Sequence, residues 1–177
     1  MSDTYQIENN AIDGEELVGS LYHSNTQIKL GGLLDQDERF FVATELSIDI
    51  SQQDISRYRL DVKDELKPDI CAYIEPPIVP DTEDDIIKVS KMPDLVIEIL
   101  SPRQAISYLI RKIKAYFELG VKSCWLVIPS LFEVRVFSQP HSLEIFDIQR
   151  NADIIDDVMD IRLPIQKVFT RYKEYCN

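Results

Sequence analysis

Apolar residues recur along this chain at two spacings, one helical and one strand-like. Residues 14–34 place leucine, isoleucine and valine at three- and four-residue steps, which predicts a helix with a break near Ser24 and Asn25. Residues 40–50 end in an alternation of apolar with acidic or hydroxyl side chains, which predicts one half-buried strand. The polar stretch 51–65 then predicts a connecting loop.

The middle of the chain predicts two apolar strands separated by a surface excursion. Residues 70–74 and 95–100 are almost entirely apolar, which is typical of strands covered on both faces. Between them, residues 75–85 contain three prolines and several acidic residues, a composition that excludes a sheet interior.

A helix is predicted to follow the second of these strands. Ser101 and Pro102 suit its cap and first turn, and Gly120 suits its end. Another apolar strand, 123–128, comes next, so we expect a right-handed crossover between parallel strands. The side chains predicted to face the core from this helix are Ile106, Leu109, Ile110, Ile113 and Phe117.

The rest of the chain predicts smaller elements around this unit. Residues 133–137 read as a half-exposed strand, 143–148 as an edge strand, and a closing helix begins at Pro164. Trp125 is expected in the core beneath the crossover helix. The predicted fold class is therefore α/β, with a central mixed sheet flanked by helices in a single domain, 1–177, whose first 13 residues we expect to be loosely held.

Composition narrows the class of protein. The chain has 177 residues, of which 45% are hydrophobic and 28% charged, as in globular proteins. It contains no apolar run near the ~18 residues of a membrane span and no signal sequence at its start, so we expect a soluble, cytoplasmic protein without a membrane partner. The widely spaced Cys71, Cys124 and Cys176 fit neither a disulfide framework nor a zinc motif.

Charge limits any contact with nucleic acid to a local surface. The net charge of −12 argues against adhesion through the overall field of the protein. Residues 101–125, however, contain five basic residues and one acid, a net +4. Two interpretations remain open: a basic patch that meets phosphates, or an ordinary solvated helix face.

Two carboxylates interrupt otherwise apolar strands. Asp69 precedes the strand 70–74, and Glu98 lies inside 95–100. Burying a charge is costly unless it is paired, protonated or bound to a cation. Each acid alone could meet solvent or a basic neighbour such as Lys67 at a strand end, whereas both together could bind one Mg²⁺ or Mn²⁺ ion.

Such an ion activates a water for attack on a phosphodiester, and a nearby lysine can stabilise the developing charge. Lys112 and Lys114 both flank the core face of the crossover helix, and periodicity does not choose between them. A lone histidine on a helix, as His23 would be, is more often a core or surface residue than a catalytic one.

Three stretches together resemble a known family. KPDICAYI, MPDLVIEILSP and RKIKAYFELGVKSCWLVIP are similar to the Uma-type family of bacterial restriction endonucleases, within the PD-(D/E)XK nuclease superfamily. The resemblance covers residues 40–137 and, more weakly, the first helix and LPIQKVF. It implies a restriction-endonuclease-like core.

The resemblance also implies roles for individual residues. Asp69 and Glu98 would be the metal ligands of the two half-motifs. The usual lysine position is Leu100, so Lys112, four residues before Tyr116, would replace it. The family often has a histidine near position 23 and an acid at the position of Tyr108. Some relatives use an acid of the first helix, so Glu15, Glu16 and Glu45 are further candidates.

These observations predict a Mg²⁺- or Mn²⁺-dependent endodeoxyribonuclease that hydrolyses DNA with a metal-activated water. The catalytic residues would be Asp69, Glu98 and Lys112. We expect a homodimer because nucleases of this superfamily often pair and residues 125–137 offer apolar strand surface. The alternative is a catalytically silent protein of nuclease fold that serves as an oligomeric interaction or regulatory module. The acidity of the chain, Leu100 and Tyr108 favour this alternative.

Overall fold

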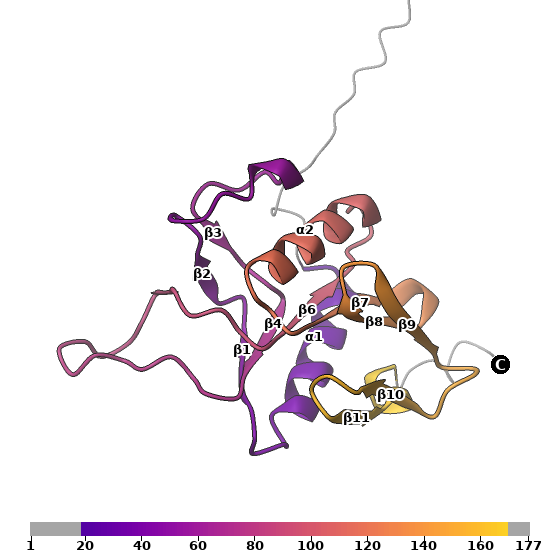
Figure 1. Ribbon diagram of the computed structural model, residues 1–177. Helices are drawn as coiled ribbons and strands as arrows, with labels where there is room; N and C mark the ends of the chain where they lie inside the picture. Colours follow the sequence, from indigo (N-terminus) through magenta and orange to yellow (C-terminus); the bar gives the residue numbers. More distant parts are fainter. Residues whose placement is uncertain (1–18, 170–177) are drawn as a thin grey trace, which may run out of the picture.

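A six-stranded mixed sheet lies at the centre of the computed structural model, which describes residues 19–169 (Figure 1). Its strand order is β1-β4-β6-β7-β8-β9, and only β6 and β7 are parallel neighbours. Its strands are β1 (Phe41–Thr44), β4 (Ile70–Tyr73), β6 (Leu95–Ile99), β7 (Ser123–Ile128), β8 (Glu133–Gln139) and β9 (Ser142–Asp147). The other elements are α1 (Leu21–Leu34), α2 (Ile106–Glu118), α3 (Ile165–Val168), the 3₁₀ helices η2 (Ser56–Tyr58) and η3 (Pro129–Leu131), β2 (Ser47–Asp49), β3 (Glu65–Leu66), β5 (Lys88–Val89), β10 (Asp153–Asp156) and β11 (Ile161–Pro164).

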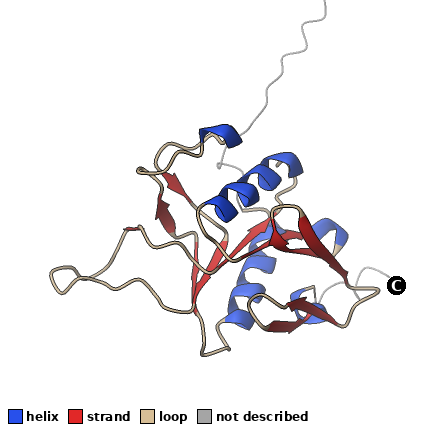
Figure 2. Ribbon diagram, viewed as in Figure 1, coloured by secondary structure: helices blue, strands red, loops and turns tan. Residues whose placement is uncertain are grey.

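Helices cover the two faces of the sheet, α1 on one side and α2 on the other (Figures 1 and 2). Leu30 of α1 packs in a core with Ile97, whereas Leu109 of α2 packs in a second core with Val96. Neighbouring residues of β6 therefore face different cores. This double burial explains why the central strands are nearly continuous apolar runs.

The structure confirms the predicted central unit. Strands β4, β6 and β7 lie where the apolar runs predict them, α2 connects the two parallel strands, and β9 forms an edge of the sheet. Gly120, with φ of 99°, follows the end of α2 in the left-handed region that glycine tolerates. Residues 74–87 project from the sheet as a long loop (Figure 1).

The predicted strand 40–50 is wrong as a single element. It breaks at Glu45, whose φ is 53°, and β2 leaves the central sheet to join β3 and β5 in a small separate sheet. The Glu45 N–H instead bonds to the carbonyl oxygens of Pro68 (3.1 Å) and Asp69 (3.3 Å). The break thus ties this turn to the start of β4.

The first helix also differs from its prediction. The helix α1 begins at Leu21, where the Ser20 side chain accepts a hydrogen bond from the His23 N–H at 3.3 Å, and it continues through Ser24 and Asn25 without the expected break. Of the predicted span, residues 14–18 lie outside the part of the chain that the structure describes.

Helix α2 starts later than predicted, and its predicted core face is confirmed at Leu109 and Ile113 but not at Ile106. It begins at Ile106 rather than after Ser101, and no side chain caps it. Ile106 is 40% exposed, whereas Lys112 and Tyr116 point inward with Leu109. The inner face is thus wider than its apolar positions, because two polar side chains on it reach Glu98 on the sheet.

Strands β10 and β11 form a hairpin that packs on the sheet. The acidic sequence of this segment did not predict it. Asp156 of β10 is 1% exposed and accepts hydrogen bonds from the Trp125 indole N–H (2.7 Å) and the Ser123 hydroxyl (2.6 Å). The backbone N–H groups of Val158 and Met159 complete its shell at 3.0 and 3.1 Å. Trp125 is buried as predicted, but in the core on the α1 face and not beneath α2.

Some expectations about surfaces also change. Trp125 and Phe137 are buried and β9 covers β8, so the apolar strand surface that we expected to serve a homodimer is not exposed there. Cys71 and Cys124 are buried free thiols, and Cys176 lies outside the described residues. Within residues 19–169, no helix is long and apolar enough to cross a membrane.

Candidate active site

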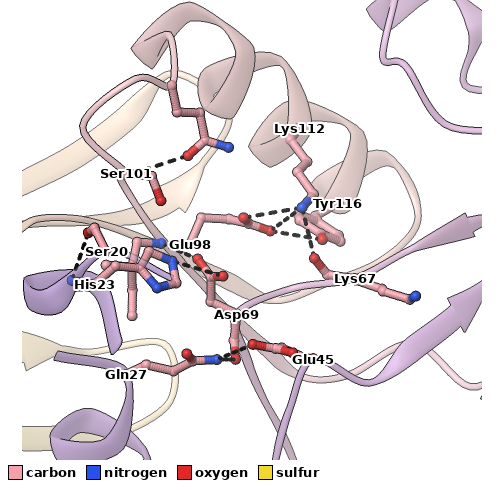
Figure 3. A network of polar contacts seen from close by, with 12 residues as sticks. Ser20, His23, Gln27, Glu45, Lys67, Asp69, Glu98, Ser101, Lys112 and Tyr116 are labelled. Carbon is pink, nitrogen blue, oxygen red and sulfur yellow. Dashed lines mark hydrogen bonds and ion pairs between the residues drawn. The ribbon is translucent and has the colours of Figure 1, made fainter. Parts of the chain in front are cut away.

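The two predicted carboxylates lie side by side on neighbouring strands (Figure 3). Strands β4 and β6 are antiparallel with Ile70 opposite Ile97, and one further step of this register places Asp69 opposite Glu98. Residues directly opposite each other share a face of the sheet. Asp69 also accepts a hydrogen bond from the Ile99 N–H at 2.6 Å, which fixes one carboxylate oxygen against β6.

Glu98 is held inside the protein by two residues of α2. It is 2% exposed; its Oε1 lies 3.0 Å from the Lys112 ammonium and accepts a hydrogen bond from the Tyr116 hydroxyl at 2.9 Å. Lys112 also reaches Oε2 at 3.2 Å. Burial raises the pKa of Glu98 to about 7; the Asp69 charge adds to this, and Lys112 opposes it.

The structure brings Lys112, and not Lys114, to the carboxylates. Lys112 is 4% exposed, and its ammonium also donates to the Lys67 carbonyl oxygen at 2.8 Å. Lys114 is half-buried and forms no ion pair with an acid of the described chain. Leu100, in the usual lysine position, packs beside the core on the α2 side.

Asp69 is held by two residues of α1 that lie one helical turn apart. The His23 Nε2 is 3.2 Å from Asp69 Oδ1, and the Gln27 amide donates to the Asp69 carbonyl oxygen at 2.9 Å. Burial lowers the pKa of His23, but the hydrogen bond to Asp69 and the nearby carboxylates outweigh it, so the pKa is raised. His23 is thus a buried residue in contact with the site rather than an ordinary core or surface histidine.

Sequence reasoning missed Gln27 entirely. Its side chain also donates to Glu45 at 3.3 Å, which places this exposed acid at the rim of the site. The available signal was the polar pair His23 and Gln27 at i and i+4, on one face of a helix with an imperfect apolar stripe. Glu15 and Glu16 lie outside the described residues.

The other departure from the family pattern, Tyr108, is part of α2 packing. It is buried in the core on the α2 side, and the Arg111 guanidinium lies 5.6 Å from its ring centroid. A cation over a tyrosine face is a favourable contact. Tyr108 therefore serves the fold, whatever an acid at this position does elsewhere.

The basic segment 101–125 offers fewer free charges than its sequence suggests. Lys112 is paired with Glu98, and Lys122 lies 2.8 Å from Asp94. The three that form no ion pair with a described acid are Arg103, Arg111 and Lys114. Any phosphate-binding surface of this segment is therefore small.

The donor set suits a hard divalent cation. Asp69 and Glu98 supply carboxylate oxygens, which Mg²⁺ and Mn²⁺ prefer, and a cation would offset the cost of burying Glu98. Within residues 19–169, no group of three or more His, Cys, Asp or Glu side chains is placed to hold a metal. Water and phosphate oxygens would therefore have to complete the coordination, as is usual for Mg²⁺.

Comparison with known proteins agrees with this fold. The chain resembles a crystal structure described as that of a "putative nuclease belonging to DUF820" from Anabaena variabilis ATCC 29413, with a TM-score of 0.67. The two chains are 21% identical, and the match covers 86% of this chain and 82% of the other. This likeness confirms the predicted fold class, an α/β restriction-endonuclease-like core with a central mixed sheet.

The family is established by the sequence itself. Residues 9–165 match the model of the Uma2 family, described as "Putative restriction endonuclease", and the chain belongs to this family. This confirms the resemblance found from the three motif stretches. No curated protein is significantly similar to the chain.

Proposed function

We propose that this protein is a Mg²⁺- or Mn²⁺-dependent nuclease that hydrolyses phosphodiester bonds in DNA. The observation that carries the proposal is the pair Asp69 and Glu98, opposed on adjacent strands, with the buried Lys112 ammonium against them. Membership of a family described as restriction endonucleases supports the choice of reaction and of DNA as substrate.

The residues have distinct roles in this proposal. Asp69 and Glu98 would hold the cation through their carboxylate oxygens. When bound, Mg²⁺ or Mn²⁺ polarises the scissile phosphate and lowers the pKa of a water molecule. Lys112 forms an ion pair with Glu98, and it would stabilise negative charge that develops on the phosphate.

Recognition of DNA must overcome the negative charge of the protein. With a net charge of −12, few phosphate contacts are available, so we infer weak binding with a shallow salt dependence that involves Arg103, Arg111 and Lys114. The proposed protein would act on DNA through local contacts rather than by gripping a long duplex.

Replacing either carboxylate by its amide tests the proposal. Asp69→Asn and Glu98→Gln should each lower Mg²⁺- or Mn²⁺-dependent cleavage of supercoiled plasmid by at least about a hundredfold, because each removes a ligand charge at the reacting centre. Calorimetric titration of Mn²⁺ should show saturable binding in the wild type and its loss in both variants. Asp153→Asn, in a surface ion pair with Arg162 3.1 Å away, is the matched control and should cleave like the wild type.

Two outcomes would contradict the proposal. Retained cleavage in both variants would exclude this pair as the reacting centre. Absence of both cleavage and Mn²⁺ binding in the wild type, with phosphate present to complete the coordination, would favour the catalytically silent interaction module instead.

A further inference from the structure

We propose that Tyr116 is a positioning residue that holds Glu98 ready for the cation while Lys112 serves the phosphate; this inference rests on the proposed function. Tyr116 is fully buried, and its hydroxyl donates to Glu98 Oε1 at 2.9 Å (Figure 3). Neither the family match nor the related structure assigns a role to this residue.

The two oxygens of Glu98 differ in that only Oε1 contacts Tyr116. Oε1 is shared by Tyr116 and Lys112, whereas Lys112 alone, among the residues described, reaches Oε2 at 3.2 Å. Lys112 cannot stay fully engaged with Glu98 and also stabilise a phosphate. If its ammonium turns to the substrate, Tyr116 remains on Oε1 and leaves Oε2 for the cation. If Lys112 turned away and the Tyr116 hydroxyl were absent, the deeply buried carboxylate of Glu98 would have lost both donors that now orient it.

The chemistry of a buried phenol suits this role. A phenol is an uncharged hydrogen-bond donor near neutral pH. A neutral donor orients a carboxylate without competing with a divalent cation for its charge. The ring is also fixed in the core with Leu109 and Ile113, so it can impose a direction on Glu98.

A matched pair of variants tests the inference. Tyr116→Phe removes only the hydroxyl. Tyr73→Phe, the control, removes the hydroxyl of an equally buried tyrosine that donates to the Lys91 carbonyl oxygen at 3.1 Å, away from the carboxylates. Calorimetry should show Mn²⁺ binding about tenfold weaker in Tyr116→Phe, the range expected for loss of one support of a metal ligand, and unchanged in Tyr73→Phe.

Kinetics should separate positioning from a general loss of structure. In Tyr116→Phe, plasmid cleavage should be low at limiting Mn²⁺ and recover at saturating Mn²⁺, with KM for DNA unchanged. A defect that saturating Mn²⁺ does not relieve would overturn the inference, and so would wild-type Mn²⁺ affinity in the folded variant. If the wild type binds no Mn²⁺, the proposed function fails first, and this inference falls with it.

A second measurement tests the inference even if the Tyr116→Phe variant does not fold. Incorporation of 3-fluorotyrosine at position 116 keeps the hydroxyl and makes it a stronger donor. Its fluorine NMR signal should shift on addition of Mg²⁺, and this shift should disappear in the Glu98→Gln background. A signal that Mg²⁺ saturation leaves unmoved in the Mg²⁺-binding protein would overturn the inference.

Discussion

Lys112→Met is expected to lower the free energy of unfolding by about 1–2 kcal/mol at pH 8 and by much less at pH 5. At pH 8 the carboxyl group of Glu98, with its pKa raised to about 7, is ionised, and Lys112 is the cation 3.0 Å from it. Without that cation the pKa of Glu98 rises above 7, so the buried carboxyl takes up a proton at pH 8, at a cost of about 1.4 kcal/mol per pH unit. At pH 5 Glu98 is protonated, and loss of Lys112 removes no ion pair.

The sign of the pH dependence follows from the direction of the shift. The pKa of Glu98 in the folded protein, about 7, exceeds the reference value of 4.5, so folding favours its protonated form. Its stabilising contribution is present below pH 4.5 and is lost as the pH rises to about 7, a change of about 3 kcal/mol for this group. Without Lys112 the pKa of Glu98 rises further, and the penalty extends to higher pH.

Urea unfolding at the two pH values measures this effect. The control is Lys114→Met on the same helix, which should change the free energy of unfolding by less than about 0.5 kcal/mol at either pH. The double variant Glu98→Gln/Lys112→Met should lose less stability at pH 8 than Lys112→Met alone, because it carries no buried carboxylate at position 98. An equal loss at both pH values would show that Lys112 contributes through packing and not through its charge.

Asp156→Asn should lower the free energy of unfolding by about 2–4 kcal/mol. Each of the two carboxylate oxygens of Asp156 accepts two hydrogen bonds, whereas an amide can accept on one side only. The NH₂ group would face two donors and leave them unsatisfied in a buried site. Position 156 is thus more sensitive than any exposed acid of the chain.

Trp125 makes the result easy to follow, because it is the only tryptophan and donates directly to Asp156. Unfolding in urea can be monitored by its fluorescence, and the native emission should change in the variant because the indole loses its partner. Asp153→Asn on the same strand breaks only a surface ion pair with Arg162 and should cost less than about 1 kcal/mol. Similar losses in the two variants would contradict a special role for Asp156.

The central sheet was predictable because burial leaves a clear record in the sequence. Strands β4, β6 and β7 are covered on both faces, so each is an apolar run with few exceptions. Asp69 and Glu98 stood out as candidate site residues because they interrupt or border these apolar runs, and a charge placed there requires compensation.

Other features depend on partners distant in the sequence. Apolar periodicity located Leu109 and Ile113 on the inner face of α2 but did not show that Lys112 and Tyr116 are buried there, because their polar groups are satisfied by Glu98 on the sheet. Gln27 was missed because it acts through an amide on the backbone of Asp69, and amides carry no signal of burial. The break at Glu45 depends on hydrogen bonds to residues 68 and 69, more than twenty positions away.

The long loop 74–87 makes the protein convenient to label. It leaves β4 at the end opposite Asp69, carries side chains as open to solvent as Ile78 at 89%, and contains none of the residues that hold the two carboxylates. Exposed loop segments of this kind are where insertions are best tolerated. A fluorophore or a short affinity tag placed near Ile78 would therefore allow the protein to be immobilised or tracked on DNA with its reacting centre unmodified.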